Sequence, residues 1–204
     1  ITESELLNST NSPAVLTYTV TPTTPDGCTG DPFTVSVTVN PLGQVDNPGD
    51  QVFCNNDNIS INFTTDNTGG DTTYSWTNTN SAIGLSNSGS GNINVTATNT
   101  TNDPITSTVT VTPSFEGCQG TPQTFTITVN PVPSIENIEQ EVCTGSGIAI
   151  TPSDGTIPSG TTYSWDAPTS SPSGAITGGN SGTDETTITE SELLNSTNSP
   201  AVLT

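Results

Sequence analysis

The side chains that could do chemistry in this sequence are carboxylates and thiols, because it contains no lysine, arginine or histidine. Twenty acidic residues give a formal charge of −20 at pH 7, and the only thiols are four cysteines. Without histidine or lysine, a serine or cysteine nucleophile has no partner to activate it near neutral pH. Without cations, nothing neutralises a nucleic-acid backbone or an anionic membrane surface. The composition therefore predicts a protein that is not an enzyme, binds no nucleic acid and inserts no part of this segment into a membrane.

Carboxylates alone could hydrolyse glycosides or bind calcium. The pairs Asp26 with Asp31 and Glu3 with Glu5 lie in strand- or turn-like text that is typical of solvated surface, and a two-acid site also needs a shaped cleft. Calcium takes six to eight oxygen ligands and suits the Asn- and Gly-rich turns better. The weak candidates for calcium ligands are Asp57, Asp66, Asp71 and Asp103. Their spacing is not that of an EF-hand, and Asn/Asp clusters are ordinary turn formers, so no metal or cofactor is predicted.

The elements that must position these groups are β-strands. Apolar residues alternate with Thr and Ser in four segments, which is the period-two pattern of strands with one buried face. The apolar members are Phe33, Val35, Val37 and Val39; Ile59, Ile61 and Phe63; Val109 and Val111; and Phe125, Ile127 and Val129. Clusters of Asn, Gly, Asp, Ser and Pro between the segments supply turns, and no convincing helical stripe is present. The sequence predicts an all-β protein of tandem immunoglobulin-like sandwiches.

The repeats set the domain organisation. Residues 1–17 recur without change at 188–204, which is a period of 187 residues. A second period of about 90 residues relates Tyr74-Ser75-Trp76 to Tyr163-Ser164-Trp165 and Gly27-Cys28 to Gly117-Cys118. We therefore expect the C-terminal part of one module in residues 1–40, a complete module in 41–130 and the N-terminal part of a further module in 131–204. The identical ends indicate a slice through a longer tandem array.

Trp76 and Trp165 occupy the same place in successive modules. Immunoglobulin-like sandwiches bury a Trp on the third strand, so we predict that both side chains are core residues. The alternative is that they form platforms on which sugar rings stack.

A small sandwich buries a modest core and would gain from a disulfide. Cys54 lies early in the middle module and Cys118 in its last hairpin, and a bridge between them would close a loop of roughly 65 residues. Cys143 and Cys28 would then pair with cysteines of neighbouring repeats. A bridge between neighbouring modules is the alternative, since sequence does not settle connectivity. Disulfides at this spacing point to an oxidising, extracellular setting.

The phrases TYSWTNTNSAIGL, ATNTTNDPITSTVTVTP and GCQGTPQTFTITVNPVP make the chain resemble the PKD-like/Ig-like repeats of giant cell-surface adhesins of Bacteroidota. The best-known members are SprB-type gliding-motility adhesins exported by type 9 secretion. The resemblance covers essentially the whole chain. It implies a cell-surface filament used for attachment or gliding, in which neighbouring repeats of the same chain are the main partners.

The predicted function is structural: repeated sandwiches give a filament reach, and proline at the joints Asn40-Pro41 and Asn130-Pro131 stiffens it. One alternative is a module that binds surface glycans, and another is a non-covalent polymer in which chains exchange strands. Asp71-Thr72-Thr73 has a form that some bacteria O-glycosylate, which makes Thr72 a candidate for modification.

Overall fold

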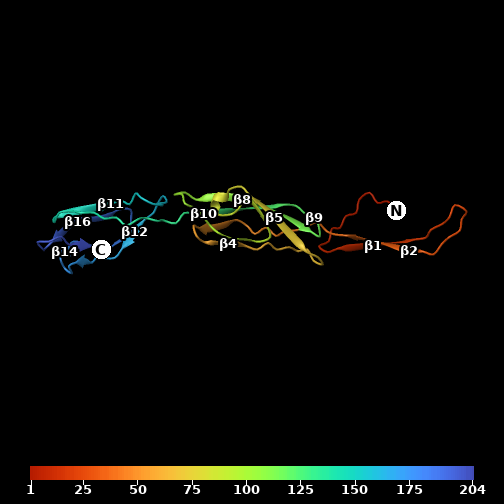
Figure 1. The fold of residues 1–204 in the computed structure, drawn as a ribbon, viewed down its shortest axis with the longest axis horizontal. Coiled ribbons are helices and arrows are strands. Elements are labelled where there is room, and N and C mark those ends of the chain that lie inside the picture. The colour runs from red at the N-terminus through yellow and green to blue at the C-terminus, as the bar shows by residue number, and fades with distance from the viewer. The chain divides into compact units, whose positions relative to one another are not determined.

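The computed structural model describes residues 1–204, which form β-strands, turns and one short 3₁₀ helix, with no α-helix (Figure 1). Contacts divide the chain into two compact units. The first comprises Ile1–Asn99 with Ile105–Asn130, and the second comprises Thr100–Pro104 with Pro131–Thr204. The all-β class is confirmed. The division into three modules at residues 40 and 130 stays a prediction.

The first unit holds ten strands and the 3₁₀ helix. They are β1 (Ala14–Val20), β2 (Phe33–Val39), β3 (Gln51–Cys54), β4 (Asn58–Ile61), β5 (Thr72–Asn78), η1 (Ser81–Ile83), β6 (Ser88–Ser90), β7 (Ile93–Thr96), β8 (Ile105–Phe115), β9 (Cys118–Gln119) and β10 (Gln123–Asn130).

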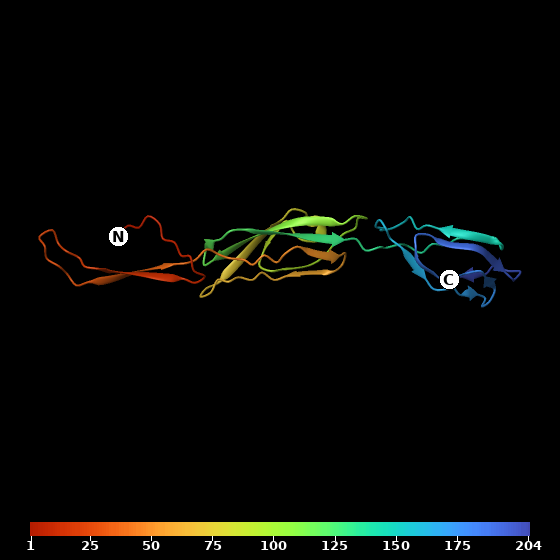
Figure 2. The ribbon, with the colours of Figure 1, turned by 180° about the vertical axis from the view of Figure 1, so that it is seen from behind.

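Strands β3 to β10 build a sandwich in residues 41–130, which we call the middle module. Its larger sheet has the order β3-β10-β8-β5-β6, with β9 also paired to β8, and its smaller sheet pairs β4 with β7. All pairs are antiparallel except β3 with β10, which run parallel. Figure 2 shows the same strands from behind. A long antiparallel sheet facing a second sheet is the architecture of an immunoglobulin-like sandwich.

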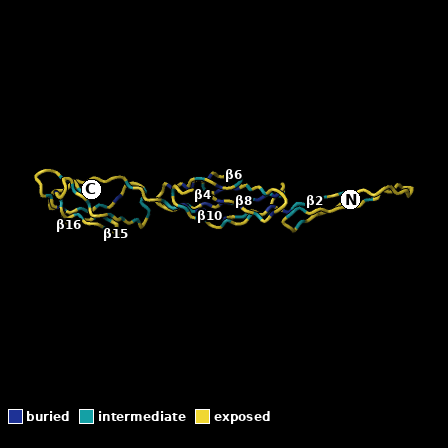
Figure 3. Tube along the Cα trace, turned by 90° about the horizontal axis from the view of Figure 1, so that it is seen from below, coloured by how far each residue is buried: buried dark blue, intermediate teal, exposed yellow.

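The core of the middle module consists of the alternating apolar residues that the sequence singles out. Ile59, Val109 and Ile127 are fully buried, and Phe63 and Phe125 pack edge to face with ring centroids 6.3 Å apart. Thr residues between them point outward, as the period of two requires. Figure 3 shows the buried positions gathered around β4, β8 and β10.

Strands β1 and β2 form an antiparallel hairpin with Ala14 opposite Val39. The hairpin corresponds in sequence to β8 and β10, and its inner residues Val35, Val37 and Val39 alternate as Phe125, Ile127 and Val129 do. Those hairpin residues are only half-buried, and Phe33 is 51% exposed. No second sheet within the sequence covers this hairpin face.

The second unit holds shorter strands. They are β11 (Ser146–Ile150), β12 (Tyr163–Trp165), β13 (Ser170–Ser171), β14 (Ile176–Thr177), β15 (Gly182–Glu185), β16 (Ile188–Asn195) and β17 (Val202–Leu203). Strand β16 lies between β11 and β14, while β12 pairs with β15 and β13 with β17. Its buried apolar side chains are few: Pro152, Ala175 and Leu193.

The two identical segments adopt different structures. Ile188–Asn195 is strand β16, in which Leu193 is 9% exposed, whereas Ile1–Asn8 forms no strand and its matching Leu6 is 38% exposed. The difference is the partner, because β11 supplies the hydrogen bonds and apolar contacts for β16 and nothing in the sequence supplies them for Ile1–Asn8. A β-strand is therefore specified here by its neighbour as much as by its own residues.

Candidate functional site: the turns that join the modules

The carboxylates considered for calcium do not converge. No group of three or more acidic or cysteine side chains is arranged to hold a metal ion. Asp57 caps the turn after β3, where its Oδ2 accepts the Cys54 N–H at 2.7 Å, and the backbone N–H of Asp71 donates to Glu116 Oε1 at 2.7 Å. Asp66 and Asp103 are exposed. These side chains shape turns, as Asn and Asp commonly do.

Trp76 lies in the core of the middle module and is 8% exposed. Its indole Nε1–H donates to the Gly91 carbonyl at 3.1 Å, and Gly89 stands opposite it in the register of β5 and β6. A Cβ on Gly89 would lie 2.6 Å from Cη2 and 2.7 Å from Cε2 of the indole, so only glycine fits against the ring. No face of this ring is free for a sugar.

Trp165 has the same arrangement in the second unit, but its ring is less buried than that of Trp76. Its Nε1–H donates to the Asn180 carbonyl at 2.9 Å, and Gly182 occupies the place of Gly89, where a Cβ would lie 2.7 Å from Cε2. The side chain is half-buried. The Trp and Gly pairing is thus a structural feature of both modules.

The expected Cys54–Cys118 bridge is wrong for this fold. All four cysteines have free thiols. Cys54 lies opposite Asn130, the last residue of β10, whereas Cys118 lies on β9, beyond the first residue of β10. The length of β10 separates them, about 23 Å at the rise of a strand, and a disulfide requires Cα atoms within about 7 Å. The sequence places Cys118 in the last hairpin of the module, but it does not say at which end of the sandwich the turn of that hairpin lies.

Thr72 stays a prediction as a glycosylation candidate, and its side chain is half-buried. Its hydroxyl oxygen is buried and has no hydrogen-bond partner. A glycan attached there would have to displace the packed end of β5.

A turn rich in side-chain hydrogen bonds occurs three times, at residues 8–13, 99–104 and 195–200. We call these the joint turns. In the first, the Asn8 Nδ2 donates to the Ser12 and Val39 carbonyls at 2.8 and 2.7 Å, and Thr10 N–H and hydroxyl both donate to Asn8 Oδ1. The third turn, at Asn195, repeats the bonds inside the turn.

The second joint turn begins with the most buried Asn of the three. Asn99 is 2% exposed, and its Nδ2 donates to the Val129 carbonyl at 2.8 Å, which matches the bond from Asn8 to Val39. Its own N–H donates to Asn55 Oδ1 at 2.8 Å. Because β3 ends at Cys54, this bond ties the end of β3 to the joint turn.

The first joint turn also contacts the start of the middle module. The Asn11 carbonyl accepts the Thr68 N–H at 2.7 Å, and Gln44 Nε2 donates to Asn11 Oδ1 at 3.0 Å. In the second unit, Asn102 takes the place of Asn11 and accepts the Ile157 N–H at 2.8 Å. Ile157 corresponds to Thr68, so equivalent residues meet at both turns, although the acceptor is the backbone carbonyl of Asn11 in the first and the side-chain Oδ1 of Asn102 in the second.

No role was predicted for these turns from the sequence. The signal is an Asn followed by Thr at the second position, Ser or Asp at the fourth and then proline, which is a side-chain-to-backbone turn motif. The sequence alone does not identify the strand that each joint turn contacts.

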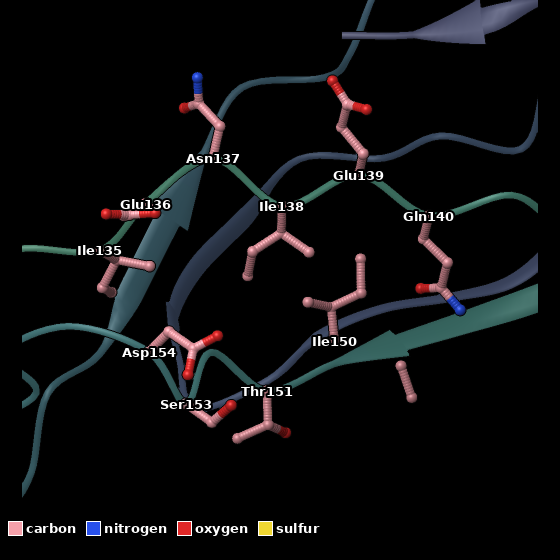
Figure 4. Close-up of a pocket in the computed structure, with 11 residues that line it drawn as sticks. Ile135, Glu136, Asn137, Ile138, Glu139, Gln140, Ile150, Thr151, Ser153 and Asp154 are labelled. Atoms are coloured by element: carbon pink, nitrogen blue, oxygen red, sulfur yellow. The ribbon is translucent and has the colours of Figure 1, made fainter.

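The hollow in the second unit lies between residues 135–140 and the region just after β11 (Figure 4). Ile138 and Ile150 point toward each other across it, and Asn137 and Glu139 point away. In the middle module the corresponding gap is closed, since the Asp46 N–H donates to the Thr64 carbonyl at 2.9 Å and β3 pairs with β10. Residues 140–143, which correspond to β3, form no strand here. The hollow therefore lies where the sheet edge is incomplete, and its lining includes Thr151, Ser153 and Asp154.

Titration is perturbed at few side chains. The Thr126 N–H, which donates to Asp50 Oδ1 at 2.7 Å, lowers the pKa of that carboxyl below its usual value. Partial burial raises the pKa of Tyr74.

The sandwich of the middle module and the repeated joint turns define an immunoglobulin-like structural module. A profile of the PKD-like domain matches residues 1–43 and 51–133. The chain belongs to the PKD-like domain family. Such domains are generally non-catalytic and typically extracellular. A search of curated proteins finds no match, and no helix of the structure has the length and apolarity to cross a bilayer.

Proposed function

We propose that this chain is part of a tandem array of PKD-like modules that gives a bacterial cell-surface filament its reach and stiffness. The observation that carries the proposal is the joint turn, which recurs with the same internal bonds and contacts the following module through equivalent residues at its first two occurrences. A contact that repeats at every joint fixes each module against the next, which a spacer needs and a freely hinged linker lacks.

Composition supports a mechanical role outside the cell. The sequence has no lysine or arginine, so proteases that cut after these residues find no site. A charge of −20 keeps neighbouring filaments apart at low ionic strength. The resemblance to adhesin repeats supports a role in attachment or gliding, on the surface of Bacteroidota that use type 9 secretion.

The test is the distribution of angles between modules in a longer array, measured by electron microscopy of single molecules. We take a chain in which residues 1–204 are followed by a second copy of residues 18–130, so that the repeats overlap in the shared segment. The expected result is a narrow angle distribution that broadens in Asn11→Ala and Gln44→Ala. Asn47→Ala, outside the joint, is the matched control. Wide scatter in the unaltered chain would refute a stiffening role.

A second candidate is a polymer held by strand exchange between chains. The observation in its favour is the uncovered apolar face of the β1–β2 hairpin, where Leu16 is 42% and Phe33 51% exposed. That face matches the one that β8 and β10 bury in the middle module, so residues of the 131–187 type from another chain could cover it. Intact mass of the native protein under denaturing conditions separates the two: a continuous array has a mass many times 20.8 kDa, and a strand-exchanged polymer falls apart into short chains.

A glycan-binding module is disfavoured, because the ring of Trp76 is covered by Gly89 and the core.

A further inference from the structure

We propose that a disulfide bridges each joint, linking a cysteine at the end of one module to a cysteine at the start of the next. The partner of Cys118 is a cysteine of the preceding module, which ends at Asn40. That cysteine is the one equivalent in position to Cys143. The inference rests on the proposal that the chain is a tandem array.

The first step is that each module carries one cysteine at each end. In the middle module, Cys118 lies at the end where the chain enters, because its carbonyl accepts the Gly43 N–H at 3.0 Å. Cys54 lies at the end where the chain leaves, opposite Asn130 in the parallel pairing of β3 and β10. Neither can reach the other, so each has a partner only beyond its own module.

The second step is that Cys143 lies at the same end as Cys54. The Asp57 N–H donates to the Cys54 carbonyl at 3.0 Å, and Ser146 N–H donates to the Cys143 carbonyl at 3.1 Å in the equivalent turn. Asn55 Oδ1 accepts the N–H of Asn99, and the Thr144 hydroxyl accepts the N–H of Asn195 in the same way. Each of these cysteines is therefore one residue from the group that holds the first Asn of a joint turn.

The third step uses the repeated segment as an overlap. Asn195 and Asn8 are the same position in two copies of one sequence, and their turns have the same internal bonds. In the second unit that turn lies beside Cys143, and in the first unit it contacts the start of the middle module through Thr68 and Gln44. The two views together put a Cys143-type cysteine and Cys118 on either side of one joint.

The stretch of chain between the two cysteine positions is short. The pairing of Cys54 with Asn130 places a Cys143-type cysteine opposite Asn40, because Asn40 and Asn130 correspond. Gly43, which bonds to Cys118, is three residues further on, at most about 10 Å of chain. Cys143 is exposed and Cys118 half-buried, so both thiols are accessible to exchange. The proposal requires the joint to bring the two Cα atoms within the roughly 7 Å that a disulfide spans.

Each bridge forms by disulfide exchange with an oxidised partner, either a protein disulfide or glutathione disulfide. The two thiols lose two protons and two electrons, one sulfur–sulfur bond forms, and the oxidant is reduced to two thiols. An extracellular location favours the oxidised state.

The experiment maps disulfides by mass spectrometry after alkylation of free thiols and digestion with pepsin and a Glu-specific protease. It uses the native protein and the chain of residues 1–204 followed by a second copy of 18–130, equilibrated with oxidised and reduced glutathione. The expected links join Cys143 to the second-copy Cys118 and Cys54 to the second-copy Cys28. Oxidised chain should also migrate faster than reduced chain on a denaturing gel.

Cys143→Ser should abolish the first link and keep the second, and Cys54→Ser should do the reverse. A link between Cys54 and Cys118 of one module, or quantitative alkylation of Cys143 in the oxidised native protein, would overturn the proposal. If the thiols stay free while the joint angles remain narrow, the bridge is refuted and the mechanical function stands. Broad angles with intact bridges would refute the function alone.

Discussion

The substitution Gly89→Ala tests the packing of the middle module at its tightest point. Gly89 lies opposite Trp76, and a new Cβ would lie 2.6 Å from Cη2 of the indole, about 1 Å inside the usual carbon–carbon contact distance. The ring cannot tilt freely, because Nε1 donates to the Gly91 carbonyl at 3.1 Å and the opposite side meets the core.

The expected cost has two parts. Overpacking a core position destabilises by about 1–3 kcal/mol, and loss of the indole hydrogen bond adds about 1 kcal/mol. For a sandwich of this size, a total of about 2–4 kcal/mol lowers the melting temperature by roughly 10–25 °C. The relevant transition is the unfolding of the middle module.

The assay is thermal unfolding followed by circular dichroism and by tryptophan fluorescence in a Trp165→Phe background, where the signal comes from Trp76 alone. Ser90→Ala, an exposed position on the same strand, is the control and should leave stability unchanged. Gly182→Ala in the second unit should cost less, since the half-buried Trp165 ring can move toward solvent. A Gly89→Ala protein within about 0.5 kcal/mol of the parent, with unaltered Trp76 emission, would refute the packing argument.

Further outcomes follow from the same structure. Ile127→Ala should cost about 2–5 kcal/mol, whereas Val37→Ala at the matching hairpin position, which is only half-buried, should cost far less by urea unfolding; equal effects would contradict the assigned core. Asn99→Ala should cost about 1–3 kcal/mol, because the Val129 carbonyl loses its donor, and the same change at exposed Asn58 is the comparison. The pKa of Asp50 is lowered in the folded state, so its stabilisation is present above the unfolded pKa, near 4, and disappears as the pH falls through the folded pKa. The difference in unfolding midpoint between the parent and Asp50→Asn should therefore be present at pH 7 and vanish near pH 2; a constant difference would argue against the Thr126 contact. Because the pKa of Tyr74 is raised in the folded state, its contribution to stability is present below the unfolded pKa, near 10, and is lost as the pH rises above that value. Tyr74→Phe should therefore remove part of the loss of stability at high pH.

The strands of the middle module were predictable because their signal is local. The alternation at Ile59, Val109 and Ile127 requires only that one face of each strand meets apolar neighbours, and the module contains both sheets that satisfy it. The role of Trp76 followed from the same reasoning.

The placement of Cys54 and Cys118 at opposite ends and the contacts of the joint turns were not predictable, because they depend on contacts between segments far apart in sequence. Cys118 and Cys54 belong to opposite ends of one sandwich, and only the parallel pairing of β3 with β10 reveals it. The two copies of the seventeen-residue segment give the clearest example, since identical residues form a strand beside β11 and no strand without it. Thr72 shows the same limit, because the burial of its hydroxyl is set by packing at the end of β5.

Single-molecule stretching of the native chain under reducing conditions tests most directly whether it is an array of independently folded sandwiches under load. The account predicts a series of discrete ruptures, each releasing about 90 residues, which is roughly 300 Å of extended chain less the length of a folded module. Reducing conditions keep disulfides from shortening the steps. A single rupture for the whole chain, or smooth extension without discrete steps, would contradict the account.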